Sequence, residues 1–521
     1  MASFASQSAY HRGMMLNNDD AYYQAMLGRD ARFDGCFFTG VTSTGIYCRP
    51  VCRVKAPKRE NCRFFGHAAQ AESAGFRPCM RCRPELAPHS LVWSTQDASH
   101  TLALQAAHLL DNFFSGARQG DAAPDLPTVA SVAARLGVSD RHLRRIFEAH
   151  LGVSPVQYLQ TRRLLSAKQL LTDTGLPMAH IAQASGFASL RRFNAAFLQH
   201  YRFSPTQLRR SSLGDGGSGS KTAKTLAGTI RVQMAYRPPY DVEALLGFIR
   251  KRQLATIEIV AAPAIIHWAA RTFGIQIAGK QHVGWVRFGF DTTRSVVQLE
   301  VSDSLGHVLP TVIARMRAAL DLDADPKAIN AVLGVHFAGT EGLRVPGCID
   351  GYEVALRAIV GQQVTVAAGR TLVQRIADAY GLPVTTPYPE LTRLFPTPSA
   401  LAQATPDALG ALGIVKQRQA AIIALSRAVD SGALDLNTPA NALATIEQLK
   451  TLPGIGDWTA QYIAIRALRW PDAFPAGDVA LHNAMGVRSE KHPARAAEAA
   501  SQAWRPWRSY AVLRAWHSLS I

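Results

Sequence analysis

Two pairs of cysteines near the N-terminus have the spacing of a metal site. Three residues separate Cys48 from Cys52, and two separate Cys79 from Cys82. Two such thiolate pairs can complete the tetrahedral shell of a zinc ion. Basic residues flank both pairs, which suits a polyanion such as DNA. We therefore predict one Zn²⁺ held by four cysteines, and these residues alone leave open whether the site is reactive or only structural.

A second site of possible chemistry is a lone carboxylate near the C-terminus. Asp478 lies in an apolar, proline-marked segment, 474–481, downstream of the glycine-rich stretch 452–460. Gly454 and Gly456 surround one isoleucine there, which predicts a tight turn between two helices. Backbone N–H groups of such a turn, together with the next helix N-terminus, can bind a DNA phosphate. The residues alone allow Asp478 either a catalytic role or the role of a helix N-cap.

An internal repeat lies between residues 99 and 212. Segments 132–147 and 181–197 both predict a helix, a glycine-containing turn and a second helix, and each copy is followed by a Ser-Pro pair. A single such hairpin is often only core structure, but two matching copies favour a doubled DNA-binding motif. The second helices carry side chains suited to phosphates and base edges, namely Arg141, Arg144, Arg191 and Arg192. With these features the region resembles the DNA-binding domain of AraC-type transcription regulators.

Composition indicates several domains and an anionic partner. The chain has 521 residues, 48% of them hydrophobic, and a formal net charge of +18. A glycine-serine stretch, 211–220, predicts a flexible linker. We expect a multidomain, mainly α protein with a small α/β zinc domain, an all-α double helix-turn-helix domain, an α/β subdomain and an all-α helix-hairpin-helix domain. Their predicted bounds are 17–88, 99–212, 226–338 and 339–521, with the linker at 213–225. In the last domain, apolar periodicity predicts helices at 352–364, 369–380, 399–404, 406–412, 416–431 and 442–449.

Cysteine usage and hydropathy bear on the compartment. Six of the seven cysteines lie within the first 82 residues, which favours metal binding over a disulfide framework. No apolar run approaches the length of a membrane span or of a signal peptide. We expect a cytoplasmic protein without a membrane partner.

The zinc region resembles the N-terminal domain of the Ada adaptive-response family. The resemblance rests on segments 44–53, 59–61 and 75–82. It implies that zinc is bound by Cys48, Cys52, Cys79 and Cys82, and that Cys48 accepts a methyl group from a DNA methylphosphotriester. It also implies DNA contacts by Thr44, Arg53, Lys55 and Arg77, although Lys55 stands where an arginine is usual. Methylation would remove one negative charge from the site and tighten DNA binding.

Residues 226–521 are similar to helix-hairpin-helix DNA glycosylases, most of all to the DNA-3-methyladenine glycosylase II (AlkA-like) family. The similarity rests mainly on segments 452–460, 474–481 and 504–511. It implies that Asp478 is catalytic and that Gln363 is the wedge that fills the gap left by a flipped base. It further implies that the base pocket is lined by Trp458, Tyr462 and Trp516. Relatives that also cleave the DNA backbone carry a lysine where this chain has Trp458, so a monofunctional glycosylase is expected.

The combined hypothesis is an alkylation-response protein that senses methylphosphotriesters, regulates transcription and excises bases such as 3-methyladenine. Its expected partners are double-stranded DNA, alkylated and promoter DNA, and RNA polymerase, and we expect a monomer. One alternative is a transcription regulator whose back half only holds DNA. Another is a repair glycosylase whose zinc domain is purely structural.

Overall fold

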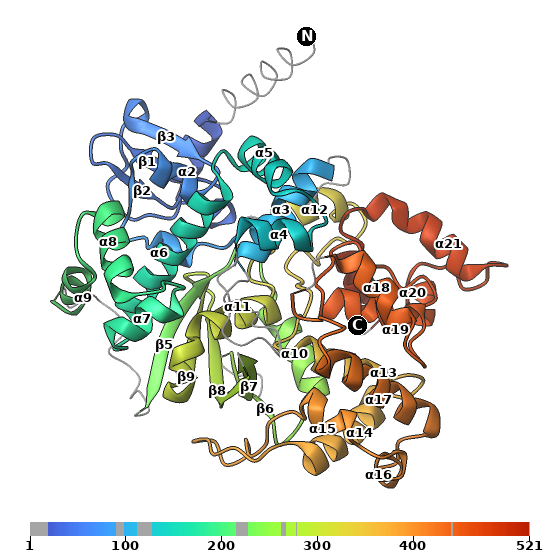
Figure 1. The fold of residues 1–521 in the computed structure, drawn as a ribbon. Helices are drawn as coiled ribbons and strands as arrows, with labels where there is room; N and C mark the ends of the chain where they lie inside the picture. The colour runs from blue at the N-terminus through green and yellow to red at the C-terminus, as the bar shows by residue number, and fades with distance from the viewer. Residues whose placement is uncertain are drawn as a thin grey trace.

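Figure 1 shows the computed structural model, which describes residues 19–89, 98–111, 128–214, 228–261, 267–277, 279–438 and 441–519. The fold class predicted from the sequence is confirmed: the protein is mainly α, with a small α/β zinc domain and a second sheet in the back half. Among the described residues, no helix combines the length and the apolar character needed to cross a membrane.

The zinc domain is built on a mixed four-stranded sheet in the order β3-β1-β2-β4. Strand β1 pairs antiparallel with β2 and β3, whereas β4 pairs parallel with β2. The parallel pairing brings the end of β2 beside the end of β4, and each of these ends leads into one cysteine pair. The elements are η1 (Ala31–Phe33), β1 (Phe38–Val41), β2 (Ile46–Cys48), η2 (Arg59–Asn61), β3 (Cys62–Phe65), α2 (Ala68–Ser73), β4 (Arg77–Pro78) and η3 (Pro84–Leu86).

Two helix-turn-helix units follow, and the long helix α6 connects them. Ser139 and Ser189 cap the second helix of each unit, because each side-chain oxygen accepts a hydrogen bond from the backbone N–H three residues later. Helix α9 continues to Gly214, so the first two residues of the predicted linker are helical, and residues 215–227 lie outside the described residues. The helices are α3 (Ala98–Asp111), α4 (Val129–Arg135), α5 (Asp140–Leu151), α6 (Pro155–Asp173), α7 (Met178–Ala184), α8 (Leu190–Tyr201) and α9 (Pro205–Gly214).

An antiparallel five-stranded sheet in the order β5-β9-β8-β7-β6 opens the back half. Alternation of buried and half-buried residues in β5 indicates a strand with one face on a core. The elements of this α/β subdomain are β5 (Thr229–Ala235), α10 (Val242–Arg252), β6 (Glu258–Val260), β7 (Trp268–Ile277), β8 (Lys280–Asp291), β9 (Val296–Ser302), η5 (Asp303–Val308), α11 (Leu309–Ala319) and α12 (Pro326–Leu333).

The rest of the described chain is helical, as expected from its periodicity. The predicted helix from Tyr352 ends at Val360, earlier than expected, because Gln363 takes a left-handed conformation (φ 52°) in the turn that follows. The helices are α13 (Gly351–Val360), α14 (Val366–Tyr380), α15 (Pro398–Ala402), α16 (Pro406–Ala411), α17 (Lys416–Asp430), α18 (Ala442–Lys450), α19 (Asp457–Arg466), α20 (Val479–Ala484), α21 (Pro493–Ala500), η6 (Ser501–Trp504) and α22 (Arg508–Ser518).

One of the hydrophobic cores contains residues of both the front and the back half. Buried residues of α6, α7 and α8 form a single cluster with buried residues of the five-stranded sheet, among them Leu170, Phe197 and Val232. Helix α6 also contacts α2 of the zinc domain and β5 of the sheet, and it lies between them in Figure 1. The zinc domain, the second helix-turn-helix unit and the α/β subdomain therefore pack together.

Candidate active site and metal centre

The four predicted zinc ligands converge at the end of the small sheet. The Sγ atoms of Cys48, Cys52, Cys79 and Cys82 all lie within 4.8 Å of one another, and all four residues are buried. The parallel pairing of β2 with β4 places the pairs together, because the N–H of Cys79 donates to the carbonyl of Tyr47 at 3.0 Å. Four thiolates without a competing hard ligand are the donor set of a structural zinc shell. The residues present fit one zinc ion.

Arg49, the residue after Cys48, stabilises this centre through hydrogen bonds to Cys82. Its backbone N–H donates to the Sγ of Cys82 at 3.3 Å, and its Nη1 donates to the Cys82 carbonyl at 2.9 Å. Its guanidinium is paired with the buried carboxylate of Asp34, with Nε donating to Oδ1 at 2.8 Å. This pair fixes the loop between the first two cysteines.

The predicted DNA contacts of the zinc domain differ in exposure. Thr44, Arg53 and Lys55 are exposed, and Arg77 is half-buried. The N–H of Arg77 donates to the Gly45 carbonyl at 2.8 Å, so strand β4 and the turn that carries Thr44 adjoin. The role of these four residues in binding DNA stays a prediction.

The predicted contacts of the helix-turn-helix units are exposed on the second helix of each unit. Arg141 and Arg144 lie on α5, and Arg191 and Arg192 lie on α8. Arg144 pairs with Asp140 at 3.2 Å across one helical turn, an exposed ion pair that contributes little to stability.

In the back half, a cavity of about 660 Å³ contains the predicted catalytic acid. Asp478 is buried and caps α20, since its Oδ1 accepts the N–H of Leu481 at 2.6 Å. Two indoles also hold it: Trp458 Nε1 donates to Oδ2 at 2.7 Å, and Trp516 Nε1 donates to Oδ1 at 3.1 Å. The same carboxylate therefore caps a helix and lines the cavity, so capping does not prevent the catalytic role, which stays a prediction.

An aromatic wall adjoins this carboxylate. Trp458 and Tyr462 stack with ring centroids 5.4 Å apart and an interplanar angle of 11°, and Trp516 lies 6.2 Å from Tyr462. All three line the cavity. Burial opposes ionisation of the Tyr462 hydroxyl, but the charges of Arg466 and Arg252 outweigh it and lower its pKa. Arg466 Nη1 donates to the Tyr462 hydroxyl at 2.9 Å.

The helical hairpin is tied to the turn that carries the predicted wedge. Gly454 has a positive φ of 75°, which favours glycine, and Gly456 precedes α19 without a side-chain cap. The amide of Gln362 donates to the Gly454 carbonyl at 2.9 Å and to the Thr459 hydroxyl at 2.9 Å. Gln363 is exposed and lines the cavity. The hairpin and the wedge position are thus held against each other.

Sequence reasoning missed several polar residues of the cavity. Arg252 and Arg466 line it, as do the members of a buried ion-pair cluster, Glu258, Arg271, Glu353 and Arg357. Arg252 lies one helical turn after Phe248, and this i,i+4 spacing on a helix could have indicated the contact between them. The glutamates and arginines of the cluster come from distant segments, so no short pattern connects them.

The chain matches four known families in succession. Residues 21–85 match the metal binding domain of Ada, and residues 132–211 match a helix-turn-helix domain. Residues 231–350 match the AlkA N-terminal domain, and residues 356–509 match the HhH-GPD superfamily of base excision DNA repair proteins.

Among its relatives is a "Probable bifunctional transcriptional activator/DNA repair enzyme AlkA" of Mycobacterium tuberculosis. It is 34% identical over 506 residues, which are 95% of this chain and 96% of the relative. The "DNA-3-methyladenine glycosylase 2" of Escherichia coli is 35% identical over 283 residues, 54% of this chain and 95% of the relative. The "Bifunctional transcriptional activator/DNA repair enzyme Ada" of Escherichia coli is 35% identical over 154 residues, 29% of this chain and 38% of the relative.

The fold and the two sites define a DNA-binding protein of transcription control and DNA repair, with a metal-binding domain at one end and a DNA glycosylase at the other. The four-cysteine cluster lies within the Ada-type domain and is consistent with one zinc ion. The chain belongs to the family of AlkA-like bifunctional transcriptional activator/DNA repair enzymes.

Proposed function

We propose that this protein excises alkylated bases such as 3-methyladenine and accepts methyl groups from DNA methylphosphotriesters on Cys48. The observation that carries the first activity is the carboxylate of Asp478, fixed by three N–H donors inside an aromatic cavity. The proposed functional units are residues 17–88, 99–212, 226–338 and 339–521.

Excision of an alkylated purine needs little assistance at the base. Alkylation at N3 or N7 gives the base a positive charge, so the bond from C1′ to the base breaks with its electron pair passing to the ring. The electron-rich faces of Trp458 and Tyr462 suit a cationic base. Asp478 stabilises the positive charge that develops on the sugar, and water then adds to C1′ and loses a proton. A base can enter the cavity only after its nucleotide has rotated out of the duplex.

The hairpin and the wedge residue serve this extrusion. The N–H groups at the start of α19, after Gly454 and Gly456, bind a backbone phosphate. Gln363 enters the gap in the base stack. Since Trp458 replaces the lysine of strand-cleaving relatives, the enzyme is monofunctional and leaves an abasic site.

The test is release of free 3-methyladenine from alkylated duplex DNA, separated by chromatography. The unaltered chain should release the base and leave the strand intact. Asp478→Asn should abolish release, whereas Asp407→Asn, at an exposed acid in the first turn of α16, should not. Base release that persists in Asp478→Asn would refute the assignment of this residue.

For methyl transfer, Cys48 is the proposed nucleophile. Zinc bound by the four cysteines would keep their thiolates deprotonated at neutral pH, which is the chemistry that the ion supplies. The Cys48 sulfur attacks the methyl carbon, the bond from carbon to the phosphate oxygen breaks, and that oxygen takes the electron pair. The products are an S-methylcysteine and an ordinary phosphodiester, so each chain reacts once.

Loss of one thiolate charge reduces repulsion of DNA by the zinc domain. Thr44, Arg53, Lys55 and Arg77 then contact the backbone, while α5 and α8 bind promoter DNA. In this proposal RNA polymerase is the further partner, and the protein acts as a cytoplasmic monomer. Peptide mass spectrometry after incubation with methylphosphotriester DNA should place a single added methyl on Cys48. A methyl elsewhere, or none, would contradict the switch.

A further inference from the structure

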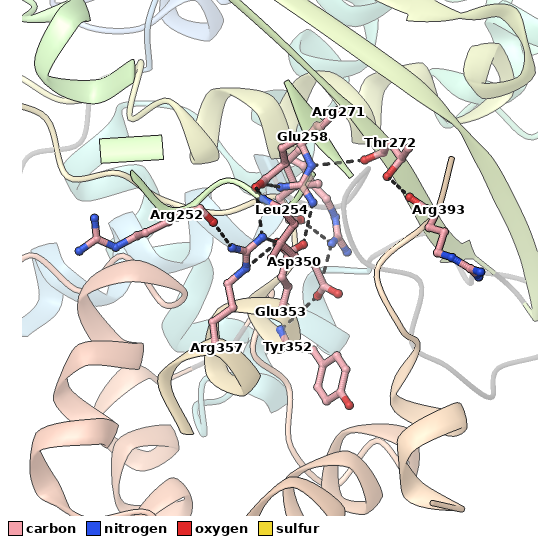
Figure 2. A network of polar contacts seen from close by, with 12 residues as sticks. Arg252, Leu254, Glu258, Arg271, Thr272, Asp350, Tyr352, Glu353, Arg357 and Arg393 are labelled. Atoms are coloured by element: carbon pink, nitrogen blue, oxygen red, sulfur yellow. Dashed lines mark hydrogen bonds and ion pairs between the residues drawn. The ribbon is translucent and has the colours of Figure 1, made fainter. Parts of the chain in front are cut away.

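Two acids and two bases form a closed ion-pair cluster in the wall of the base cavity (Figure 2). Arg271 on β7 donates from Nη1 to Glu258 at 2.9 Å and from Nη2 to Glu353 at 2.7 Å. Arg357 on α13 contacts the same two carboxylates, Glu353 at 2.6 Å and Glu258 at 3.2 Å. Each glutamate therefore bridges both arginines, and the cluster joins the sheet to α13.

The cluster is neutral and mostly shielded from water. The exposed fractions of the side chains are 10% for Glu258, 7% for Glu353 and 16% for Arg271. Buried ion pairs of this kind contribute little net stability, because desolvation offsets their attraction. Stability alone therefore gives no reason for four buried charges at this place.

Arg357 differs from Arg271 because it also contacts Arg252, another residue that lines the base cavity. Its Nη1 donates to the backbone carbonyl of Arg252 at 2.8 Å, as Figure 2 shows. Arg252 is the last residue of α10, where the carbonyl groups lack partners within the helix. Arg357 supplies one such partner and holds the end of α10 against α13.

The side chain of Arg252 in turn faces the aromatic wall. Its guanidinium lies 3.8 Å from the centroid of the Phe248 ring. The same ring lies 4.7 Å from the guanidinium of Arg466, which donates to the Tyr462 hydroxyl at 2.9 Å. Against the effect of burial, the charges of Arg466 and Arg252 lower the pKa of Tyr462. Both aromatic residues line the cavity. The position of the Arg252 backbone therefore determines where the Arg252 guanidinium lies relative to Tyr462.

We propose that Arg357 is a positioning residue for base excision: held by Glu353 and Glu258, it fixes Arg252 and thereby the geometry of the Tyr462 wall. This role rests on the proposed glycosylase activity. Arg271 completes the charge balance of the cluster but has no such contact with Arg252. The two arginines thus offer a matched comparison within one cluster.

The experiment compares two double variants of the full chain, Glu353→Gln/Arg271→Met and Glu353→Gln/Arg357→Met. Each removes one acid and one base, so the cluster stays neutral and no buried charge is left unpaired. Melting temperature and single-turnover release of 3-methyladenine are measured for both. We expect equal melting temperatures. The Arg271 variant should show the smaller loss of release, because Glu258 and the amide oxygen at position 353 can still accept hydrogen bonds from Arg357. The Arg357 variant should lose about 10- to 100-fold. Equal release rates in the two variants would overturn the positioning role.

A further cycle tests whether Arg357 acts through Arg252. Arg252→Met is made alone and within the Glu353→Gln/Arg357→Met variant. If Arg357 acts through Arg252, the added substitution should lower the release rate no further. Independent, multiplying losses would contradict that route.

Arg357→Lys is a second variant for the case that a double variant fails to fold. It keeps the charge but cannot contact Glu353, Glu258 and the Arg252 carbonyl together, so release should fall while the fold persists. Unchanged release in this variant would also count against the proposal. Failure of the unaltered chain to release base would instead refute the glycosylase assignment itself, and this role with it.

Discussion

Trp458 and Asp478 are joined by a hydrogen bond of 2.7 Å from the indole Nε1 to Oδ2. The residues are 20 positions apart and come from α19 and the start of α20. Because Trp458 also stacks on Tyr462, one side chain sets both the aromatic wall and the direction of the carboxylate. The cavity is therefore organised before any DNA is bound.

Substitution of Asp478 by asparagine should separate its two roles. Asparagine caps helices about as well as aspartate, but its NH₂ group would face the Trp458 indole N–H and leave that donor unpaired. The free energy of unfolding should therefore fall by about 1 to 3 kcal/mol, which leaves the chain folded. Loss of the negative charge beside the sugar should reduce base release by about 10²- to 10³-fold or more. Thermal melting and single-turnover release from alkylated duplex DNA measure the two effects. A large fall in melting temperature would mean that the residue acts mainly through the fold.

Removal of zinc should affect more than the zinc domain. Opening the four-cysteine shell by chelation or by Cys79→Ser should unfold the small sheet around it. Glu85 in η3 pairs with Lys168 of α6 at 2.6 Å, with both side chains 1% exposed, so this unfolding would leave a buried lysine without its partner. We expect loss of one zinc per chain and a lower melting temperature for the whole protein. Cys36→Ser, outside the shell, is the control and should retain the metal.

Arg237 should be a main determinant of the contact between the zinc domain and the back half. It is fully buried and donates to the Asp34 carbonyl at 2.8 Å, the His89 carbonyl at 2.8 Å and the Asp323 carbonyl at 2.8 Å. Arg237→Met would leave these acceptors unpaired, at a cost of about 1 to 3 kcal/mol for each group left without a partner.

Urea unfolding and hydrogen exchange of residues 19–89 would measure the effect of Arg237→Met. Arg231→Met, in the preceding strand β5 and at a partly exposed ion pair with Glu300, should cost much less. Equal effects of the two substitutions would argue against a role for Arg237 in joining the domains.

Stability should fall in mild acid because of two half-buried histidines between the halves. Burial, aided by the nearby charge of Arg162, lowers the pKa of His89 to about 4, and burial with Arg469 lowers that of His108 to about 4. The ordinary value is 6.5, so the folded state binds fewer protons than the unfolded state between these pH values. Their contribution to stability is complete above pH 6.5 and is lost progressively as the pH falls toward 4.

The free energy of unfolding from urea titrations between pH 7.5 and 4.5 would measure this loss. His89→Gln removes one of the two groups and should make the dependence on pH shallower over that interval. An unchanged slope in this variant would show that other groups govern the acid response.

Much of the architecture is encoded in short stretches of sequence. The cysteine spacing, the repeated helix-turn-helix pattern and the Gly454 turn each depend on residues close together in the chain, so local patterns predict them. The helices from Tyr352 to Leu449 were likewise found close to their predicted bounds, since a 3.6-residue period is a local signal.

Tertiary structure alone decided the relations between distant segments. No pattern connects Glu258 with Glu353, or Asp34 with Arg237, because such pairs form only when separate elements pack together. The glycine-serine stretch suggested two separate halves, yet the buried faces of α6, α7 and α8 complete the core of the five-stranded sheet. The sequence by itself determined which residues can bind a metal or carry a charge. Packing decided which of them meet, because burying an apolar face or pairing a charge needs a partner that only the folded chain supplies.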